Sequence, residues 1–135
     1  MPRERSLLKT VVIIDNDLGF VFWLGHLLDQ HEYVALPARS VPDAALLILQ
    51  LDLQLDLLII NPDLMGGLDF ISAVRRPNRD VRVIAVIDDP EKPLAIHGLD
   101  GVVPKAKVLD EATQAEWIDC VQQVLAPRSA PAALN

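Results

Sequence analysis

Five short apolar segments recur along the chain and outline its expected framework. Residues 11–14 (VVII), 57–60 (LLII) and 83–87 (VIAVI) are unbroken and consist of β-branched residues, leucine and alanine. Continuous apolar segments of this length are typical of strands that are covered on both faces of a parallel sheet. Residues 33–36 (YVAL) and 101–103 (GVV) complete a predicted set of five strands.

The segments between these strands carry the signals of helix starts. Asp17 precedes LGFVFWLGHLLDQ and can cap it, and Ser40 can cap a helix with Pro42 in its first turn and Asp43 three residues on. Asp110 opens the last helical segment, with acidic residues at the end where the helix dipole favours them. Strands that alternate with helices predict an α/β fold, a doubly wound three-layer sandwich joined by right-handed crossovers.

One segment allows two interpretations. Residues 47–57 (LILQLDLQLDL) alternate between apolar and polar positions and could form one long strand. We favour a helix that ends at about Leu51, a turn over residues 52–54 and then the strand at 57–60.

The composition limits the kind of protein that this chain can be. Its 135 residues, 51% of them hydrophobic, suit one domain with a buried core, which we expect over residues 9–126. Residues 1–8 are then an N-terminal extension. Residues 127–135, which are small, proline-containing and unpatterned, are a flexible tail or the start of a linker.

Charge and apolar length exclude two classes of partner. Because the net charge is −7 and the 12 Lys and Arg residues are scattered, we expect no binding to nucleic acid. The sequence has no apolar stretch of the roughly 18 residues that a membrane span requires, and no signal-peptide pattern at its N-terminus. Cys120 is the single cysteine, which fits a reducing, cytoplasmic location.

Polar residues follow several of the predicted strands. In open parallel sheets, functional groups gather outside the carboxyl ends of the strands, where these residues would meet. Any one of them could instead serve only as a turn or cap residue. The joint pattern favours a site made of residues that end the first, third, fourth and fifth strands, namely Asp15, Asn16, Asn61, Asp88, Asp89 and Lys105.

With these residues in place, the chain resembles the receiver domains of two-component response regulators. The resemblance implies a flavodoxin-like (βα)5 sandwich with the strand order 2-1-3-4-5. It places Asp15 and Asn16 at the family's acidic pair, Asn61 at its phospho-accepting aspartate, Ile87 at its Ser or Thr, and Lys105 at its lysine. Only the first acid and the lysine therefore keep the family's chemistry.

Two further positions depart from the family pattern. Ala106 replaces the proline that usually follows the lysine, and Val102 stands where the family often has a switch aromatic. The segment DPEKPLAIHGLD, which should hold the fourth helix, is short and contains Pro90 and Pro93. The two substitutions weaken the expectation of a phosphorylation switch, and the short segment weakens that of the family's usual dimer face.

The substitutions predict a site without phosphoryl chemistry. The Asn61 amide is a very weak nucleophile, and Asp15 can pair with Lys105 while Asn61 accepts a hydrogen bond from the lysine. At the four aligned positions of this site the formal charges cancel, so we expect no metal site and weak or absent Mg²⁺ binding. The expected function is that of a pseudo-receiver in signal transduction, which is not an enzyme and needs no cofactor.

Two alternatives remain open from the sequence. Asp63 could act as a non-standard phospho-acceptor, although it lies two residues beyond Asn61 and after Pro62. The fold could also serve as a flavodoxin-like binder of a small ligand, which would require a cavity near Asp15 and Asn61.

A domain without phosphoryl chemistry would act through its surfaces. We expect Leu18, Val21 and Phe22 to face outward from the first helix, and we regard Trp117 on the last helix as a further interface position, or else as the edge of the core. The partner would be a histidine kinase, a phosphotransfer protein or an effector domain, and a homodimer is a further option.

Overall fold

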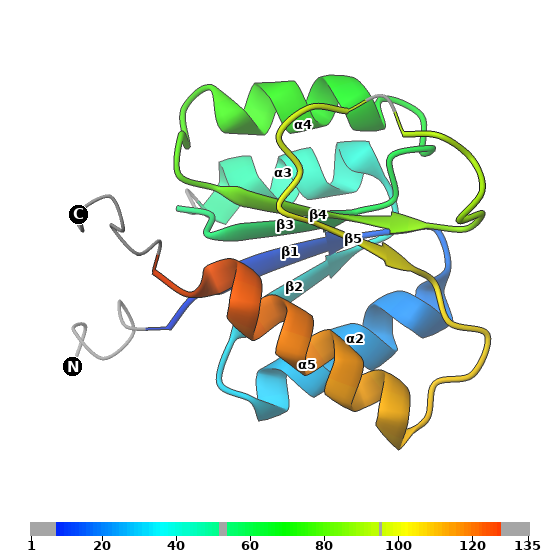
Figure 1. Ribbon diagram of the computed structural model, residues 1–135. Helices are drawn as coiled ribbons and strands as arrows, with labels where there is room; N and C mark the ends of the chain where they lie inside the picture. Colours follow the sequence, from blue (N-terminus) through cyan, green and yellow to red (C-terminus); the bar gives the residue numbers. More distant parts are fainter. Residues whose placement is uncertain (1–7, 52–53, 95, 128–135) are drawn as a thin grey trace, which may run out of the picture.

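The computed structural model describes residues 8–51, 54–94 and 96–127, with the backbone alone at residue 51, and in them a five-stranded parallel sheet (Figure 1). The spatial order of the strands is β2-β1-β3-β4-β5, as the resemblance implies. The register pairs Val11 with Leu57, and Leu57 with Arg82, in the middle of the sheet. The strands are β1 (Thr10–Ile14), β2 (Val34–Ala38), β3 (Leu57–Ile60), β4 (Arg82–Ile87) and β5 (Gly101–Pro104).

Helices cover both faces of the sheet, which makes the predicted three-layer sandwich. Helices α3 and α4 lie on one face, and α2 and α5 lie on the other (Figure 1). This arrangement follows from right-handed crossovers that reverse direction at β1. The helices of the described residues are α2 (Leu18–Gln30), α3 (Val41–Leu51), α4 (Gly67–Arg75) and α5 (Glu111–Leu125).

The helix starts follow the predicted capping residues. Asp17 Oδ1 accepts a hydrogen bond from Phe20 N at 3.2 Å, and Asp110 Oδ1 accepts one from Thr113 N at 3.0 Å. Ser40 Oγ accepts one from the backbone of the first turn of α3. Helix α3 ends at residue 51, as the helical interpretation of this ambiguous segment predicts; residues 52 and 53 of the expected turn lie outside the described part of the chain.

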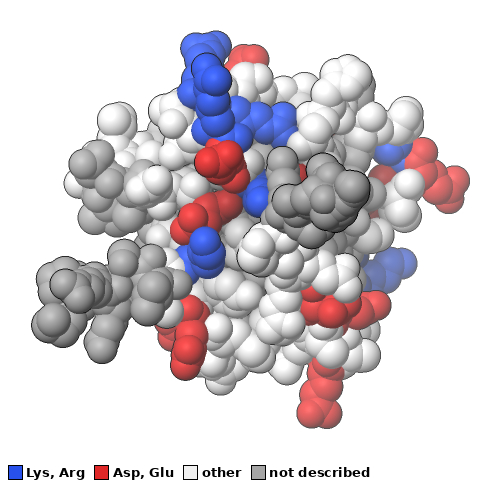
Figure 2. All heavy atoms as spheres, turned by 60° about the vertical axis from the view of Figure 1, so that its left-hand side comes forward, with Lys and Arg blue, Asp and Glu red and all other residues white. Residues whose placement is uncertain are grey.

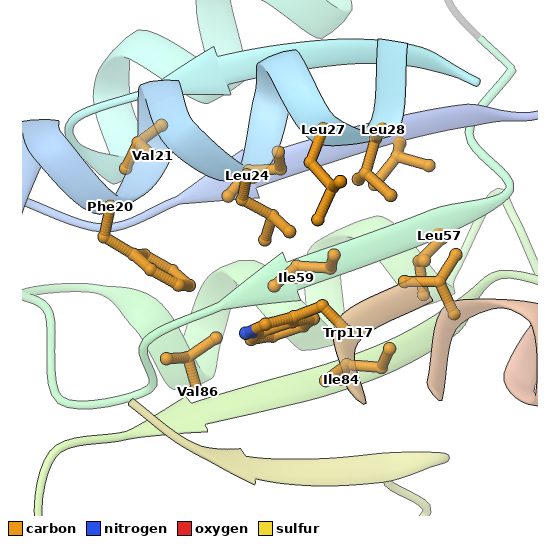
Figure 3. Packing of buried hydrophobic residues seen from close by; sticks show 13 residues of the cluster. Phe20, Val21, Leu24, Leu27, Leu28, Leu57, Ile59, Ile84, Val86 and Trp117 are labelled. Atoms are coloured by element: carbon orange, nitrogen blue, oxygen red, sulfur yellow. The ribbon is translucent and has the colours of Figure 1, made fainter. Parts of the chain in front are cut away.

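The core consists of two apolar layers, one on each face of the sheet. Strands β1 and β3 are buried along their apolar lengths, which explains why these segments show no polar alternation. On the α2 and α5 face, Trp117 lies among the side chains of α2, β3 and β4 (Figure 3), and its ring centroid is 5.7 Å from that of Phe20. Trp117 is 1% exposed, so its assignment to an interface is wrong and it belongs to the core.

The connection from β4 to β5 differs most from a regular alternation of strands and helices. Its described residues, which exclude residue 95, form turns and bends and no helix. The connection is tied to the sandwich by Arg75, whose guanidinium donates hydrogen bonds to the carbonyls of His97 and Gly98. Asp100 Oδ2 accepts a hydrogen bond from Val83 N at 2.8 Å, which fixes the approach to β5. Pro90 and Pro93 disfavour a helix over these described residues, because proline lacks the N–H of an i→i−4 hydrogen bond and its ring clashes with the preceding turn.

The edge strand β2 is shifted from the predicted residues 33–36 to Val34–Ala38 and includes Pro37. Proline is tolerated there because an edge strand leaves part of its backbone unpaired. The face of the molecule at the amino ends of the strands carries positive and negative side chains next to one another (Figure 2). In the described part of the chain, the helices are too short or too polar to cross a membrane.

Candidate functional site

The carboxyl ends of four strands bring polar side chains together. Asp15 follows β1, Asn61 follows β3, Asp88 follows β4, and Lys105 follows β5. Backbone hydrogen bonds continue the sheet into these residues, from Asn61 N to Ile14 O and from Lys105 N to Ile87 O. The sheet therefore positions all four side chains, as expected for the functional edge of a doubly wound fold.

A buried ion pair forms the centre of this cluster. Lys105 Nζ lies 2.7 Å from Asp15 Oδ2, and Asp15 is fully buried while the lysine side chain is 14% exposed. The ammonium also lies 5.6 Å from the centroid of the Phe20 ring, a distance at which a cation is attracted to the aromatic face. The predicted pairing of Asp15 with Lys105 is thus present, and it gives a counter-ion to a carboxylate that water cannot reach.

Asn61 acts as a hydrogen-bond donor toward this cluster. Its Nδ2 lies 3.1 Å from Asp88 Oδ2 and 3.5 Å from Asp15 Oδ1, while its Oδ1 accepts a hydrogen bond from Asp63 N at 3.0 Å. The opposite amide orientation would place an oxygen against two carboxylates and an NH₂ group against a backbone N–H. The expectation that Asn61 accepts a hydrogen bond from the lysine is therefore wrong.

The sequence places Asp88 at this edge of the sheet, but it does not predict that Asp88 bridges two other residues of the site. Its Oδ1 lies 3.1 Å from Lys105 Nζ and its Oδ2 accepts the hydrogen bond from Asn61, so one carboxylate joins the ends of three strands. The hydrogen bond with Lys105, together with that from Asn61, outweighs partial burial and lowers the pKa of Asp88. Burial opposes the charge of Lys105, but the hydrogen bonds to Asp15 and Asp88 outweigh it and raise the pKa of the lysine.

The charge of the cluster extends beyond the four aligned positions. Asp17 Oδ2 lies 3.8 Å from Lys105 Nζ, so the carboxylates of Asp15, Asp17 and Asp88 face a single ammonium. Asp17 and Asp88 have side chains about half exposed to water, which screens their charges. The pair that lies in the low-dielectric interior is Asp15 with Lys105, and that pair is neutral overall.

The remaining aligned positions lie outside the hydrogen bonds of this cluster. Ile87, at the end of β4, is partly buried and offers a hydrocarbon side chain, and Asn16 is exposed. Val102 on β5 is 45% exposed, next to the connection that lacks a helix. Ile87 stands at the family's Ser or Thr position and Val102 at its aromatic position. Both are aliphatic side chains, which cannot donate a hydrogen bond.

Asp63, the alternative acceptor, points to a different partner. Its Oδ1 lies 3.3 Å from Lys92 Nζ, and both side chains are more than half exposed. Its backbone N–H donates a hydrogen bond to Asn61 Oδ1, while its carboxylate forms its ion pair with Lys92 and not with Lys105. The loop closes at Gly67, where a Cβ atom would lie 3.0 Å from the carbonyl oxygen of Pro62.

The donor atoms of this cluster do not fit the Mg²⁺ ion that the resemblance implies. Mg²⁺ needs oxygen ligands, including one or two carboxylates, in near-octahedral geometry. Asp15 Oδ2 is already in contact with the Lys105 ammonium, and Asp15 Oδ1 accepts hydrogen bonds from Asp17 N and Asn61 Nδ2. Since Asn61 presents its NH₂ group, a cation here would meet two nitrogen donors beside one buried carboxylate.

A second feature is an apolar groove between α2, β2 and α3. The groove has a volume of about 440 Å³, and Leu18 and Phe22 at its rim are 44% and 60% exposed, as predicted for an outward face of α2. Val21 lines the groove but is 1% exposed, so the prediction that it faces outward is wrong. Leu46 of α3, which is 54% exposed, contributes a further apolar side chain.

Comparison with known proteins identifies the fold. The chain matches no protein-family profile, and no curated protein sequence is similar to it. Among solved structures, a response regulator from Thermotoga maritima superposes with a TM-score of 0.72 at 16% identity, covering 89% of this chain and 99% of that one. The chain has the receiver fold of response regulators.

Two further receiver-fold structures superpose on this chain with similar TM-scores and identities. The response regulator TrrA from Thermotoga maritima, solved in complex with Mg²⁺ and BeF, has a TM-score of 0.68 at 20% identity and covers 87% of this chain and 100% of its own. HP1043, an orphan response regulator of H. pylori, has a TM-score of 0.67 at 18% identity, with 87% and 96% covered. At these identities the likeness establishes the receiver fold, and the site residues must be judged on their own chemistry.

Proposed function

We propose that this chain is a pseudo-receiver, a signalling domain that acts through protein contacts and is not phosphorylated at the end of β3. The observation that carries the proposal is the amide of Asn61, whose Nδ2 donates toward Asp15 and Asp88. Phosphoryl transfer would require a carboxylate oxygen at this point and a cation beside it. Here an amide nitrogen takes the place of the nucleophile, and the Lys105 ammonium contacts the Asp15 oxygen that a cation would need.

The ion pair of Lys105 with Asp15 also supports the proposal, because it bears on whether the domain could change conformation after phosphorylation. Lys105 is engaged by Asp15 and Asp88 at 2.7 and 3.1 Å, so its charge is already compensated within the chain. Ile87 has no hydroxyl with which to follow a phosphoryl group, and Val102 has no ring. We infer a domain held in one conformation, without catalytic activity and without a bound cofactor.

The groove beside α2 is the surface that we propose for protein contacts. Leu18 and Phe22 expose apolar area on a helix whose other large apolar residues are buried or, in the case of Trp23, partly buried, a pattern that marks interaction sites. The partner in this proposal is a histidine kinase, a phosphotransfer protein or an effector domain in the cytoplasm, and a second copy of the chain is the alternative.

Treatment with a small-molecule phosphodonor tests the proposal and its rival together. We expect intact-mass spectrometry to detect no hydroxylamine-sensitive phosphoryl adduct, the behaviour of an aspartyl phosphate, after incubation of the chain with acetyl phosphate and Mg²⁺. An adduct that Asp63→Ala abolishes, while Asp15→Ala leaves it unchanged, would establish Asp63 as the acceptor. Asp63 forms its salt bridge with exposed Lys92, whereas Lys105 contacts Asp15, Asp17 and Asp88, which argues against that outcome.

A further inference from the structure

Asp88, which follows β4, stands out because its carboxylate contacts one residue after β3 and another after β5. Its two oxygens are divided between two donors, with Oδ1 at 3.1 Å from Lys105 Nζ and Oδ2 at 3.1 Å from Asn61 Nδ2. Neighbouring Asp89 has a different role, because its Oδ1 accepts a hydrogen bond from Glu91 N in the turn that follows. The pattern expected for a turn residue therefore describes Asp89, while Asp88 faces the site.

The position of this carboxylate matters for any group that might bind residue 61. A carboxylate oxygen in hydrogen-bond contact with Nδ2 leaves no room for a further group bonded to that end of the side chain. The same carboxylate offers negative charge to Lys105, the only ammonium among the described residues that contacts Asp15. An external anion would have to displace Asp88 and would meet its charge at close range.

We propose that Asp88 is a built-in anionic clamp, which occupies the place of an external phosphoryl group and holds the ends of β3, β4 and β5 in one arrangement. The inference rests on the proposed function and adds the means by which the site stays closed. Charge-assisted hydrogen bonds are stronger than neutral ones, which suits a carboxylate for this role. The clamp also explains why the β4–β5 connection keeps a defined start although it contains no helix in its described part.

Restoring the missing acids separates the effect of Asp88 from that of Asn61. The test compares two proteins, the variant Asn16→Asp with Asn61→Asp, and the same variant with Asp88→Ala added. The probe is Mg²⁺ with beryllofluoride, followed by the ¹⁹F resonance of the bound ion and by the amide shift of Lys105. We expect the variant that lacks Asp88 to bind the probe about tenfold more tightly or better, because an ion pair and a like-charge repulsion are removed together.

Asp89→Ala in the same background is the matched control and should leave the affinity unchanged. Equal affinity with and without Asp88 contradicts the clamp, and so does failure of both proteins to bind, because another feature then keeps the anion out. Binding of the probe by the unaltered chain would contradict the proposed function itself. The variants with restored acids therefore test the clamp, whereas the unaltered chain tests the proposed function.

A measurement without any ligand tests the clamp in the otherwise unaltered chain. Lys105 N donates a 2.8 Å hydrogen bond to Ile87 O, which lies directly before Asp88. We expect Asp88→Ala to speed hydrogen exchange at this amide, Asp88→Asn to have a smaller effect, and Asp89→Ala to have none. Exchange that is the same in all four proteins contradicts a clamp between β4 and β5. Because Asp88 is more than half exposed, these variants should fold, which far-ultraviolet circular dichroism checks.

Discussion

A single amide sets the character of the site at the residue scale. Asn61 is 3% exposed, and each of its polar atoms has a partner, which leaves its side chain with a structural role. The buried carboxylate of Asp15 depends on Lys105 in the same way. Groups this deeply buried are costly when one partner is removed, because the other keeps its charge without water to solvate it.

Replacing Lys105 tests this dependence. We expect Lys105→Ala to lower the free energy of unfolding by about 3–5 kcal/mol, since it leaves the fully buried Asp15 without its counter-ion. Urea denaturation measures the change, and Lys107→Ala, at an exposed position after β5, serves as the control with an effect within about 0.5 kcal/mol. A loss for Lys105→Ala no larger than that of the control would show that Asp15 does not need the pair.

The lowered pKa of Asp88 predicts a dependence of stability on pH. Because the folded chain binds this proton less readily than the unfolded chain, the contribution of Asp88 is complete above the ordinary value of 3.8 and is lost as the pH falls through the lower folded value. The difference in unfolding free energy between the unaltered chain and Asp88→Asn should therefore shrink below pH 3.8. Its size should stay below about 1 kcal/mol, since water screens a half-exposed carboxylate.

Urea denaturation at a series of pH values measures this difference, with Asp89→Asn as the control. A difference that grows as the pH falls would have the wrong sign for a lowered pKa.

At the scale of elements, the packing of α2 and α5 against the sheet separates core residues from surface residues. Trp117 projects from α5 into the apolar layer between α2 and the sheet (Figure 3). Phe22 projects from α2 away from this layer. Both are large aromatic side chains in helices rich in apolar residues. Only the contacts of the neighbouring elements decide which of them is buried.

The two aromatic side chains should differ sharply when they are truncated. We expect Trp117→Ala to reduce the free energy of unfolding by about 3–5 kcal/mol, because it leaves a cavity among α2, β3 and β4. Phe22→Ala should change it by no more than about 0.5 kcal/mol, since the side chain is 60% exposed. Thermal and urea unfolding of both variants measure the difference. Similar losses for the two variants would contradict the assignment of Phe22 to a free surface.

At the scale of the whole molecule, most of the fold could be predicted from the sequence. Unbroken apolar segments identified the strands, and Asp17, Ser40 and Asp110 identified the helix starts, because strand burial and capping leave direct marks on local sequence. The end of β2 was missed, since Pro37 interrupts the apolar pattern without ending an edge strand.

The candidate site was predictable in part, for a physical reason. Parallel strands bring their carboxyl ends together, so the meeting of Asp15, Asn61 and Lys105 follows from the order of the elements. The role of Asp88 did not follow, because Asp88 and Asp89 are equal in sequence, and only the twist of the chain after β4 turns one toward Lys105. Val21 and Trp117 were misplaced for a similar reason: helical spacing gives a face of one helix, while burial depends on the elements packed around it.

We propose above all that the site at the end of β3 does not respond to a phosphoryl group. An NMR titration of the unaltered chain with Mg²⁺ and beryllofluoride tests it most directly, with TrrA, whose structure holds Mg²⁺ and BeF, as the positive control. We predict that the amide resonances of residues 15, 61 and 105 stay in place while those of TrrA shift. Saturable shifts at these three residues would show that the site binds a phosphoryl group and that the domain is not a pseudo-receiver.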